Sequence, residues 1–196
     1  KKLLGTIELS DELRHNSKEA ISKLKKLGVK NIIMLTGDTK QKAKIIADEL
    51  GITEVRAELL PQDKAKIVKE LMNEGKKVAF VGDGINDAPA LISAHVGISM
   101  SRGADIAKAT ADISLLKDDI MAVVEAKEYA NKTMNLINNN FNATVGINSC
   151  ILAGATFGVF FLIVTAVLHN GTTIGLLLNS IKGVNINNNF NSKNFE

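Results

Sequence analysis

The stretch Val81-Gly82-Asp83-Gly84-Ile85-Asn86-Asp87-Ala88-Pro89-Ala90-Leu91 decides the fold of this chain. The mostly apolar run 77–81 predicts a buried strand that ends within it. Asn86 or Asp87 as a cap and Pro89 in the first turn predict that a helix begins here. Asp83 and Asp87 are therefore expected at the carboxyl edge of a strand, which is where open α/β sheets bind ligands.

The side chains of this central stretch predict a site for a metal ion and a phosphate. Two carboxylates beside exposed backbone N–H groups suit a hard cation with oxygen ligands, and Mg²⁺ with a phosphate is the best match. An ordinary polar turn with a helix cap is the alternative. It accounts for one aspartate and one asparagine, but it leaves the second carboxylate and the two glycines unexplained.

Strands and helices are expected to alternate through the first 132 residues. Short apolar runs bounded by turn residues predict strands, and apolar residues spaced three and four apart predict helices. Strands are expected at 2–9, 31–35, 55–57, 77–81, 96–100 and 112–116, and helices at 17–27, 39–50, 63–73, 103–110 and 118–131. This alternation predicts an α/β domain with a parallel sheet and right-handed crossovers.

Two further positions are candidates for phosphate chemistry. Thr36-Gly37-Asp38 follows the strand at 31–35, and it offers a hydroxyl group and a glycine that lets an anion approach the backbone. Lys64 lies in the first turn of the helix at 63–73, where the helix dipole disfavours a cation, so a bound phosphate would be a suitable partner. Taken alone, these positions are also explained by a capped turn and a solvated surface lysine.

Charge is distributed unevenly along the chain. No Lys, Arg, Asp or Glu occurs between Thr133 and Ile181, whereas the residues before this stretch are rich in charge. At roughly 20 residues per membrane-spanning helix, the uncharged stretch predicts two such helices. They are expected at about 137–157 and 160–181, with a tight turn near Gly158.

Flanking lysines orient the predicted hairpin. Lys127 and Lys132 precede it and Lys182 follows it, so both of its ends are expected on the cytoplasmic side. A buried soluble hairpin is the alternative. Membrane packing is favoured by glycines at small-xxx-small spacing, which are Gly154, Gly158, Gly171 and Gly175. The Asn-rich segment 185–196 is expected to be a disordered cytoplasmic tail.

Composition excludes few classes of function. The net charge of +3 is too small to indicate a nucleic-acid partner. Cys150 is the only cysteine, so no internal disulfide can form. No initiating methionine or signal peptide precedes the first predicted strand, and we therefore expect a segment of a longer protein.

Three motifs stand in order along the chain: Thr36-Gly37-Asp38, Pro61-Gln62-Asp63-Lys64 and the stretch from Gly82 to Pro89. Together they resemble the phosphorylation domain of P-type ATPases, which has a haloacid-dehalogenase-like fold. Asp11 and Arg14 match an Asp-x-x-Arg segment of the heavy-metal-transporting branch. By this resemblance, residues 1–132 would be the C-terminal portion of that domain, and residues 133–184 would hold the last two transmembrane helices.

The resemblance implies a role for the carboxylates of the central stretch. Asp83 would ligate the Mg²⁺ that accompanies an acyl phosphate, and Asp87 and Asn86 would support its ligands. The phosphorylated aspartate of the family lies in an Asp-Lys-Thr-Gly-Thr motif, which this sequence lacks. We therefore expect this chain to be inactive by itself.

The resemblance also implies a phosphate-binding group. Thr36 and the N–H of Gly37 would hold phosphate oxygens, Asp38 completes the same motif, and Lys64 would neutralise the negative charge. Such residues act in phosphoryl transfer by positioning and by electrostatic stabilisation.

In the membrane region, His169 is the candidate ligand for a transported metal. Imidazole suits Zn²⁺, Co²⁺, Ni²⁺ and Fe²⁺, and helical geometry places Thr172 and Thr173 on the face of His169. Asn148 of the preceding helix would approach that face in an antiparallel hairpin. A hydrogen bond between the two helices is the alternative role of His169.

Comparison with the branches of the family favours a divalent metal over Cu⁺. The segment His169-Asn170-Gly171-Thr172-Thr173 resembles the cobalt/iron type, which has Glu where Asn170 stands. The zinc/cadmium type has Asp where His169 stands and Lys where Asn148 stands. The Met and paired serines of the copper type do not occur in the last helix.

The whole sequence thus resembles the C-terminal segment of an ATP-driven pump for a divalent heavy metal. The implied cofactors are Mg²⁺ and ATP, with the nucleotide bound mainly by a domain that this sequence lacks. The implied partners are the nucleotide-binding and actuator domains, the earlier membrane helices and membrane lipid, with no nucleic acid. Residues 1–132 would be cytoplasmic, at the plasma membrane of a prokaryote.

Three other interpretations stay open. One is a soluble-type phosphatase of the same superfamily with a membrane anchor, and another is a non-catalytic membrane-anchored module that keeps only the Mg²⁺ site. A potassium-pumping P-type subunit is a further relative, although two closing helices fit it less well.

Overall fold

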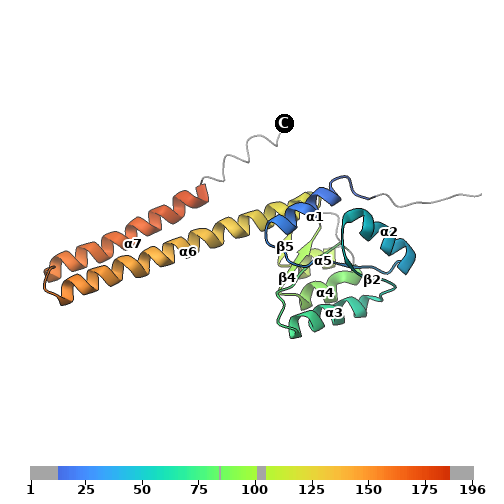
Figure 1. Ribbon diagram of the computed structural model, residues 1–196, viewed down its shortest axis with the longest axis horizontal. Coiled ribbons are helices and arrows are strands. Elements are labelled where there is room, and N and C mark those ends of the chain that lie inside the picture. The colour runs from blue at the N-terminus through green and yellow to red at the C-terminus, as the bar shows by residue number, and fades with distance from the viewer. Residues whose placement is uncertain (1–12, 84, 101–104, 186–196) are drawn as a thin grey trace, which may run out of the picture. The chain divides into compact units, whose positions relative to one another are not determined.

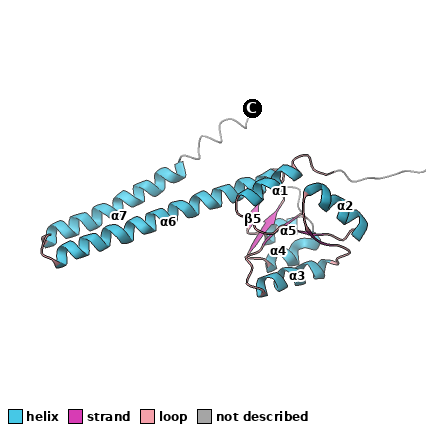
Figure 2. Cartoon of the chain, in the orientation of Figure 1, coloured by secondary structure: helices cyan, strands magenta, loops and turns pink. Residues whose placement is uncertain are grey.

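The computed structural model describes residues 13–83, 85–100 and 105–185. The chain divides into two compact units, residues 1–128 and residues 129–196. The first unit is an α/β structure, and the second is a pair of helices (Figures 1 and 2).

Strands and helices alternate through the first unit (Figure 1). In chain order they are α1 (Ser17–Lys26), β1 (Ile33–Leu35), α2 (Lys40–Leu50), β2 (Glu54–Arg56), α3 (Pro61–Asn73), β3 (Ala79–Gly82), the 3-10 turn η1 (Ile85–Asp87), α4 (Ala88–Ser93), β4 (Val96–Ser99), α5 (Asp105–Thr110) and β5 (Ile113–Ser114). The alternation expected from the sequence is confirmed for these elements. The strand expected at 2–9 lies outside the described residues.

All described strands pair in parallel, but they form two sheets. β1 pairs with β2 in one sheet, and β3, β4 and β5 follow one another in the other. The predicted parallel pairing is confirmed, but the structure has two hydrogen-bonded sheets where the sequence predicted a single sheet. Side-chain packing connects the two sheets, because Leu35 of β1 packs against the buried cluster that includes Phe80 of β3. Alternation of elements predicts parallel strands, but it does not determine which strands form hydrogen bonds with each other.

Two apolar clusters form the core of the first unit. One contains the buried residues Val68, Phe80, Ala90 and Leu91, and the other contains Ile98, Met100, Leu115 and Val123. Gly97 lies within β4 against α4, and an added Cβ would be 2.7 Å from the Leu91 carbonyl oxygen. Only glycine allows α4 to pack this closely over β4.

The helix α1 shows how local charge supports the first unit. Glu19 lies in its first turn and Lys25 in its last, as the helix dipole favours. Lys23 donates a hydrogen bond to Glu19 at 2.8 Å, and this bond lowers the pKa of the Glu19 carboxyl.

The second unit contains most of α6 (Met121–Thr156), which begins in the first unit, and α7 (Leu162–Asn185). Separate helices at 118–131 and 137–157 were the expectation, and this is wrong, because α6 is continuous. The reason is that residues 132–136 contain neither Gly nor Pro, so nothing there ends a helix. The turn predicted near Gly158 is confirmed: its φ is +73°, and Val159 N–H donates to the Gly154 carbonyl at 2.8 Å.

Polar side chains and close glycine contacts join α6 to α7, which run side by side in opposite directions (Figure 1). Asn140 donates to Ser180 at 2.7 Å and accepts from Asn179 at 2.8 Å. An added Cβ at Gly183 would be 2.6 Å from a methyl group of Leu136. Gly171 and Gly175 face open space instead, so these members of the small-xxx-small pattern do not pack between the two helices.

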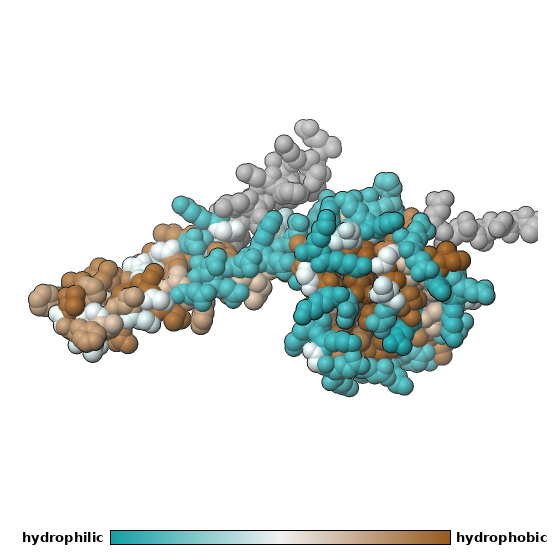
Figure 3. Space-filling model, viewed as in Figure 1, coloured by the Kyte–Doolittle hydropathy of each residue, from teal (hydrophilic) through white to brown (hydrophobic). Residues whose placement is uncertain are grey.

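The second unit exposes many large apolar side chains, and Figure 3 shows apolar residues over much of this hairpin. Within the described part of the chain, Leu162–Gly183 in α7 is the segment long and apolar enough to cross a membrane, with a mean hydropathy of 1.4. The second predicted span is thus an apolar helix of sufficient length. The asparagines at 138–140 and 142 lower the hydropathy of α6, and the first predicted span stays a prediction.

Candidate functional site

The end of β3 carries two carboxylates in different surroundings. β3 ends at Gly82, and the side chain of Asp83, which follows it, is 55% exposed. Asp87 occupies the N-cap position of α4, and its side chain is only 11% exposed. The Asp87 side chain makes no capping hydrogen bond. Asp83 is therefore available to a ligand from solvent, whereas Asp87 is held within the protein.

Lys64 is the ionic partner of Asp87. Its Nζ donates to Asp87 Oδ1 at 2.7 Å, and the lysine side chain is 18% exposed. A solvated surface lysine was one interpretation of Lys64, and the contact with Asp87 contradicts it. Sequence reasoning assigned a bound phosphate as the partner of this cation and missed Asp87. No local pattern could have found the pair, because the two residues are 23 positions apart on different elements.

Gly82 is required by the position of Asp87. An added Cβ at Gly82 would be 2.8 Å from Asp87 Cβ and 2.9 Å from Asp87 Oδ2. These distances are shorter than van der Waals contact, so any other residue at 82 would displace the carboxylate. Gly82 therefore leaves the space that the Asp87 carboxylate occupies.

Thr36-Gly37-Asp38 forms a closed polar turn after β1. Thr36 Oγ1 donates to Asp38 Oδ2 at 2.9 Å and accepts from the Asp38 N–H at 3.1 Å. Lys42 lies 3.5 Å from the other carboxylate oxygen of Asp38. Gly37 and Asp38 are exposed, so the turn is accessible to a ligand.

Backbone hydrogen bonds fix this turn against the segment that leads into α3. Leu59 N–H donates to the Thr36 carbonyl at 3.1 Å, and Glu58 N–H donates to the Asp38 carbonyl at 2.9 Å. Glu58 adopts a left-handed conformation with φ +58°, which lets the chain make both contacts. The Asp63 carboxylate accepts from Leu60 N–H at 2.9 Å and so caps α3, the helix that carries Lys64.

Arg14 reaches the same edge of β3 from far away in the sequence. Its guanidinium lies 3.5 Å from Asp83 Oδ2 and donates to Asp118 Oδ1 at 2.6 Å. The sequence singled out Arg14 through the Asp-x-x-Arg resemblance but gave no signal for Asp118, which is 104 positions later. Asp11, the other residue of that segment, lies outside the described residues.

In the second unit, His169 of α7 lies against Asn148 of α6. The distance between His169 Nδ1 and Asn148 Oδ1 is 3.1 Å, so the expected approach of these two side chains is confirmed. The hydroxyl groups of Thr172 and Thr173 donate to the carbonyls of Leu168 and His169 within α7. With Nδ1 donating to the amide oxygen, Nε2 carries the free lone pair of the ring.

Known proteins with similar sequences indicate the family to which this chain is related. The model of the haloacid dehalogenase-like hydrolases matches residues 1–95. A manganese-exporting P-type ATPase of Mycobacterium leprae is 41% identical over 91% of this chain and 25% of its own length. A cadmium-transporting ATPase of Staphylococcus aureus is 40% identical over 93% of this chain and 25% of its own length. This chain is homologous to the C-terminal portion of heavy-metal P-type ATPases.

Solved structures agree with this family. A zinc-transporting PIB-type ATPase in an E2.Pi state superposes with a TM-score of 0.80 at 38% identity, over 88% of this chain and 28% of that chain. The catalytic domain of the CPx-ATPase CopB-B gives a TM-score of 0.56 at 43% identity, over 60% of this chain and 46% of its own. The haloacid-dehalogenase-like fold expected from the sequence is thus confirmed, and heavy-metal P-type ATPases share it. This chain spans about a quarter of the length of the curated relatives it matches.

The first unit of this P-type ATPase segment offers donors that fit Mg²⁺. No group of three or more His, Cys, Asp or Glu side chains gathers around a common point in the described ranges. Mg²⁺ does not need one, because it is commonly held by one or two carboxylates, by water and by phosphate oxygens. The exposed carboxylate of Asp83 and the fixed carboxylate of Asp87 suit this mode of binding.

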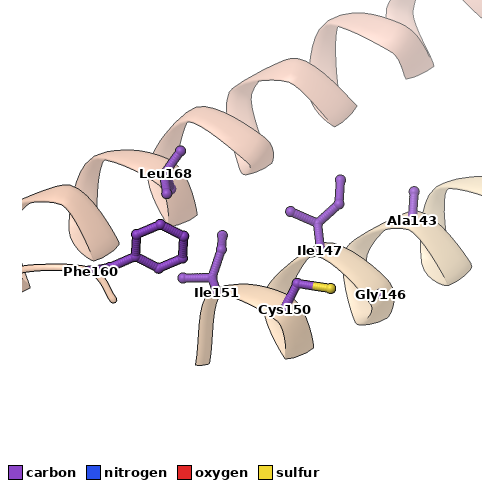
Figure 4. Close-up of a pocket in the computed structure, with 7 residues that line it drawn as sticks. All are labelled: Ala143, Gly146, Ile147, Cys150, Ile151, Phe160 and Leu168. Carbon is purple, nitrogen blue, oxygen red and sulfur yellow. The ribbon is translucent and has the colours of Figure 1, made fainter. Parts of the chain in front are cut away.

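The cavity between the helices of the second unit has a different character. Its volume is about 410 Å³, and Figure 4 shows Phe160, Leu168, Ile147, Ile151 and Cys150 around it. These side chains are apolar apart from the thiol. His169 and Asn148 are not among the residues that line it, so this cavity offers little to bind a metal ion.

Proposed function

We propose that this chain supplies the Mg²⁺- and phosphate-binding part of an ATP-driven pump for a divalent heavy metal, together with a membrane hairpin of that pump. Residues 1–132 are the C-terminal portion of the phosphorylation domain, and residues 133–184 carry two membrane spans. The nucleotide-binding domain, the actuator domain and earlier membrane helices of the same pump are its partners. The first unit faces the cytoplasm of a prokaryotic cell.

One observation carries the proposal: the mostly buried Lys64–Asp87 pair and the solvent-exposed Asp83 are both at the end of β3, where Asp87 lies against Gly82 and Asp83 follows it. A lysine held by an aspartate at the carboxyl end of a parallel strand places positive charge where a phosphoryl group can bind. The exposed carboxylate of Asp83 can accept a cation in exchange for its 3.5 Å contact with Arg14. The positive charge of Lys64 suits the phosphate, and the negative charge of Asp83 suits the metal ion that binds with it.

The proposed roles follow from this arrangement. Asp83 and Asp87, with Asn86 beside them, hold Mg²⁺, which would neutralise phosphate charge when bound. Lys64 attracts phosphate oxygens through its ammonium group, which the hydrogen bond to Asp87 holds in place. These residues orient and stabilise, and the bond to phosphorus forms on an aspartate that this chain does not contain.

We assign the closed turn of Thr36, Gly37 and Asp38 as a second phosphate-binding group. Its exposed backbone at Gly37 can donate an N–H to an anion. The Thr36 hydroxyl hydrogen is directed at Asp38 and has to turn away before it can reach a phosphate oxygen. Asp38 therefore positions Thr36 in this proposal.

His169 is the proposed ligand for the transported ion in the membrane hairpin. Asn148 orients the imidazole through Nδ1, and Nε2 can then bind a metal ion. Thr172, one helical turn away, supplies a hydroxyl oxygen nearby. The names of the relatives cover manganese, zinc and cadmium. Manganese was not among the metals that sequence reasoning considered, and it joins zinc, cadmium, cobalt, iron and nickel as a candidate.

The substitution Asp83→Asn in the complete pump tests the proposal. We expect a loss of Mg²⁺-dependent phosphoenzyme, because the exposed carboxylate is replaced by a weaker neutral donor. Circular dichroism and the thermal transition of the variant are expected to match the parent, since Asp83 is on the surface. Arg56→Gln is a matched surface control. Normal phosphoenzyme levels in Asp83→Asn would contradict the assignment of the site.

A labelling experiment separates the pump from a phosphatase with a membrane anchor. We expect the 196-residue chain alone, with ATP and Mg²⁺, to take up no acid-stable phosphate. An enzyme that is complete in this chain would form a phosphoenzyme or release phosphate from a general substrate. Either result would favour the phosphatase.

A further inference from the structure

Arg14 is shared between two aspartates that belong to different parts of the first unit. Its two terminal nitrogens lie 3.5 Å from Asp83 Oδ2 and 2.6 Å from Asp118 Oδ1. We propose that Arg14 is an internal counter-cation which competes with Mg²⁺ for Asp83, and that Asp118 sets the outcome by drawing Arg14 toward itself. This inference rests on the proposed Mg²⁺ site and adds a residue pair that regulates its affinity.

The competition follows from the position of the guanidinium. Arginine stays protonated at all relevant pH values, so its charge cannot be removed when a metal ion arrives. A divalent cation bound to Asp83 would be repelled by a guanidinium 3.5 Å from the same carboxylate. Arg14 therefore has to move away from Asp83 as Mg²⁺ binds.

Asp118 provides the place to which Arg14 can withdraw. The Arg14–Asp118 contact is shorter than the Arg14–Asp83 contact, and the Asp118 side chain is 21% exposed against 55% for Asp83. The less hydrated ion pair is the stronger one. The next residue, Asp119, accepts from Met121 N–H at 2.9 Å, which fixes the backbone just before α6, where Asp118 lies.

The proposal gives the two residues opposite effects on Mg²⁺ binding. Arg14→Gln removes the competitor, and the Kd for Mg²⁺ is expected to fall about threefold, the size typical of a partly exposed ion pair. Asp118→Asn releases Arg14 toward Asp83, and the Kd is expected to rise by about the same factor. In the double variant the effect of Asp118→Asn should disappear, because Asp118 acts through Arg14.

Titration of the full chain with MgCl₂ tests this. The chain is labelled with ¹⁵N, held in detergent at constant ionic strength, and followed through the backbone amide shifts of Gly82 and Asp87. Arg56→Gln is the matched control, since it removes the same charge from an arginine that pairs with Glu54 instead. Its Kd is expected to equal that of the parent.

The outcomes separate this inference from the proposed function. If Asp83→Asn leaves the Mg²⁺ titration unchanged, the proposed site itself is wrong. If Asp83→Asn abolishes binding while Arg14→Gln and Arg56→Gln give equal shifts, Arg14 acts only as general surface charge and the inference fails. Additive effects in the Arg14→Gln/Asp118→Asn double variant would also overturn it, because they would show that Asp118 acts without Arg14.

Discussion

The ammonium group of Lys64 donates to the Asp87 carboxylate at 2.7 Å, and this bond joins the first turn of α3 to the start of α4. Both side chains are mostly buried. Removing one member of such a pair leaves the other charge poorly hydrated, whereas removing both avoids that cost. The pair therefore serves stability as well as the proposed chemistry, and the two contributions can be measured separately.

Lys64→Met is expected to lower the free energy of unfolding by about 1–3 kcal/mol, because it withdraws a charged donor from a largely buried carboxylate. Asp87→Asn is expected to do the same. The double variant Lys64→Met/Asp87→Asn should be less destabilised than the sum of the two single variants. Urea unfolding followed by circular dichroism measures all three, and strictly additive losses would show that the pair is not coupled.

Gly82→Ala is expected to cost about 1–3 kcal/mol of stability, because its Cβ would overlap Asp87. Gly37→Ala is the matched control in the same unit. Its Cβ would meet only the Leu59 carbonyl at 3.4 Å, an ordinary contact, and a change within about 0.5 kcal/mol is expected. Equal losses in the two variants, measured by thermal unfolding, would refute the steric explanation.

Glu58→Gly is expected to raise stability by about 0.5–1 kcal/mol, because glycine adopts the left-handed conformation at 58 without strain. Glu58→Val is expected to lower stability, since a β-branched residue is disfavoured there. Glu58→Gln removes only the exposed contact with Lys40 and serves as the control. A stability of Glu58→Gly below that of Glu58→Gln would contradict the prediction.

His169→Ala in the complete pump is expected to lower metal-stimulated ATPase activity and to leave phosphorylation from inorganic phosphate intact. The physical reason is the loss of the imidazole nitrogen that faces away from Asn148. Asn170→Ala is the matched control, because the Asn170 side chain donates to the Ala166 carbonyl of its own helix. If His169→Ala and the parent bind the same amount of metal with the same stimulation, His169 is a packing residue.

Local patterns were sufficient to predict much of the fold. The apolar run before Gly82 predicted β3 to within two residues, and the Asn-Asp pair followed by Pro89 predicted the start of α4, although it left open which of the two residues is the cap. The turn at Gly158 was equally predictable, since glycine is the residue that most readily takes a positive φ at the end of a helix. The candidate site residues could be named because strand ends carry polar side chains at short spacing.

Contacts between residues that are far apart in the sequence could not be predicted from the same local patterns. The partner of Lys64 and the bridge from Arg14 to Asp118 depend on side chains that approach each other only after the chain has folded. The division into two sheets depends on which strands exchange hydrogen bonds, and alternation says nothing about this. The continuity of α6 was missed because a change from charged to uncharged residues was treated as the end of a helix, although it alters only the solvent that the helix prefers.

The turn between α6 and α7 has a consequence for experiments on intact cells. Only five residues, Phe157-Gly158-Val159-Phe160-Phe161, connect the two helices, and none of them has a polar side chain. With the proposed hairpin in a bilayer, this turn gives proteases, antibodies and thiol reagents nothing to recognise from outside. Detecting the protein at the cell surface would therefore require an epitope inserted after Gly158, where the backbone already reverses direction.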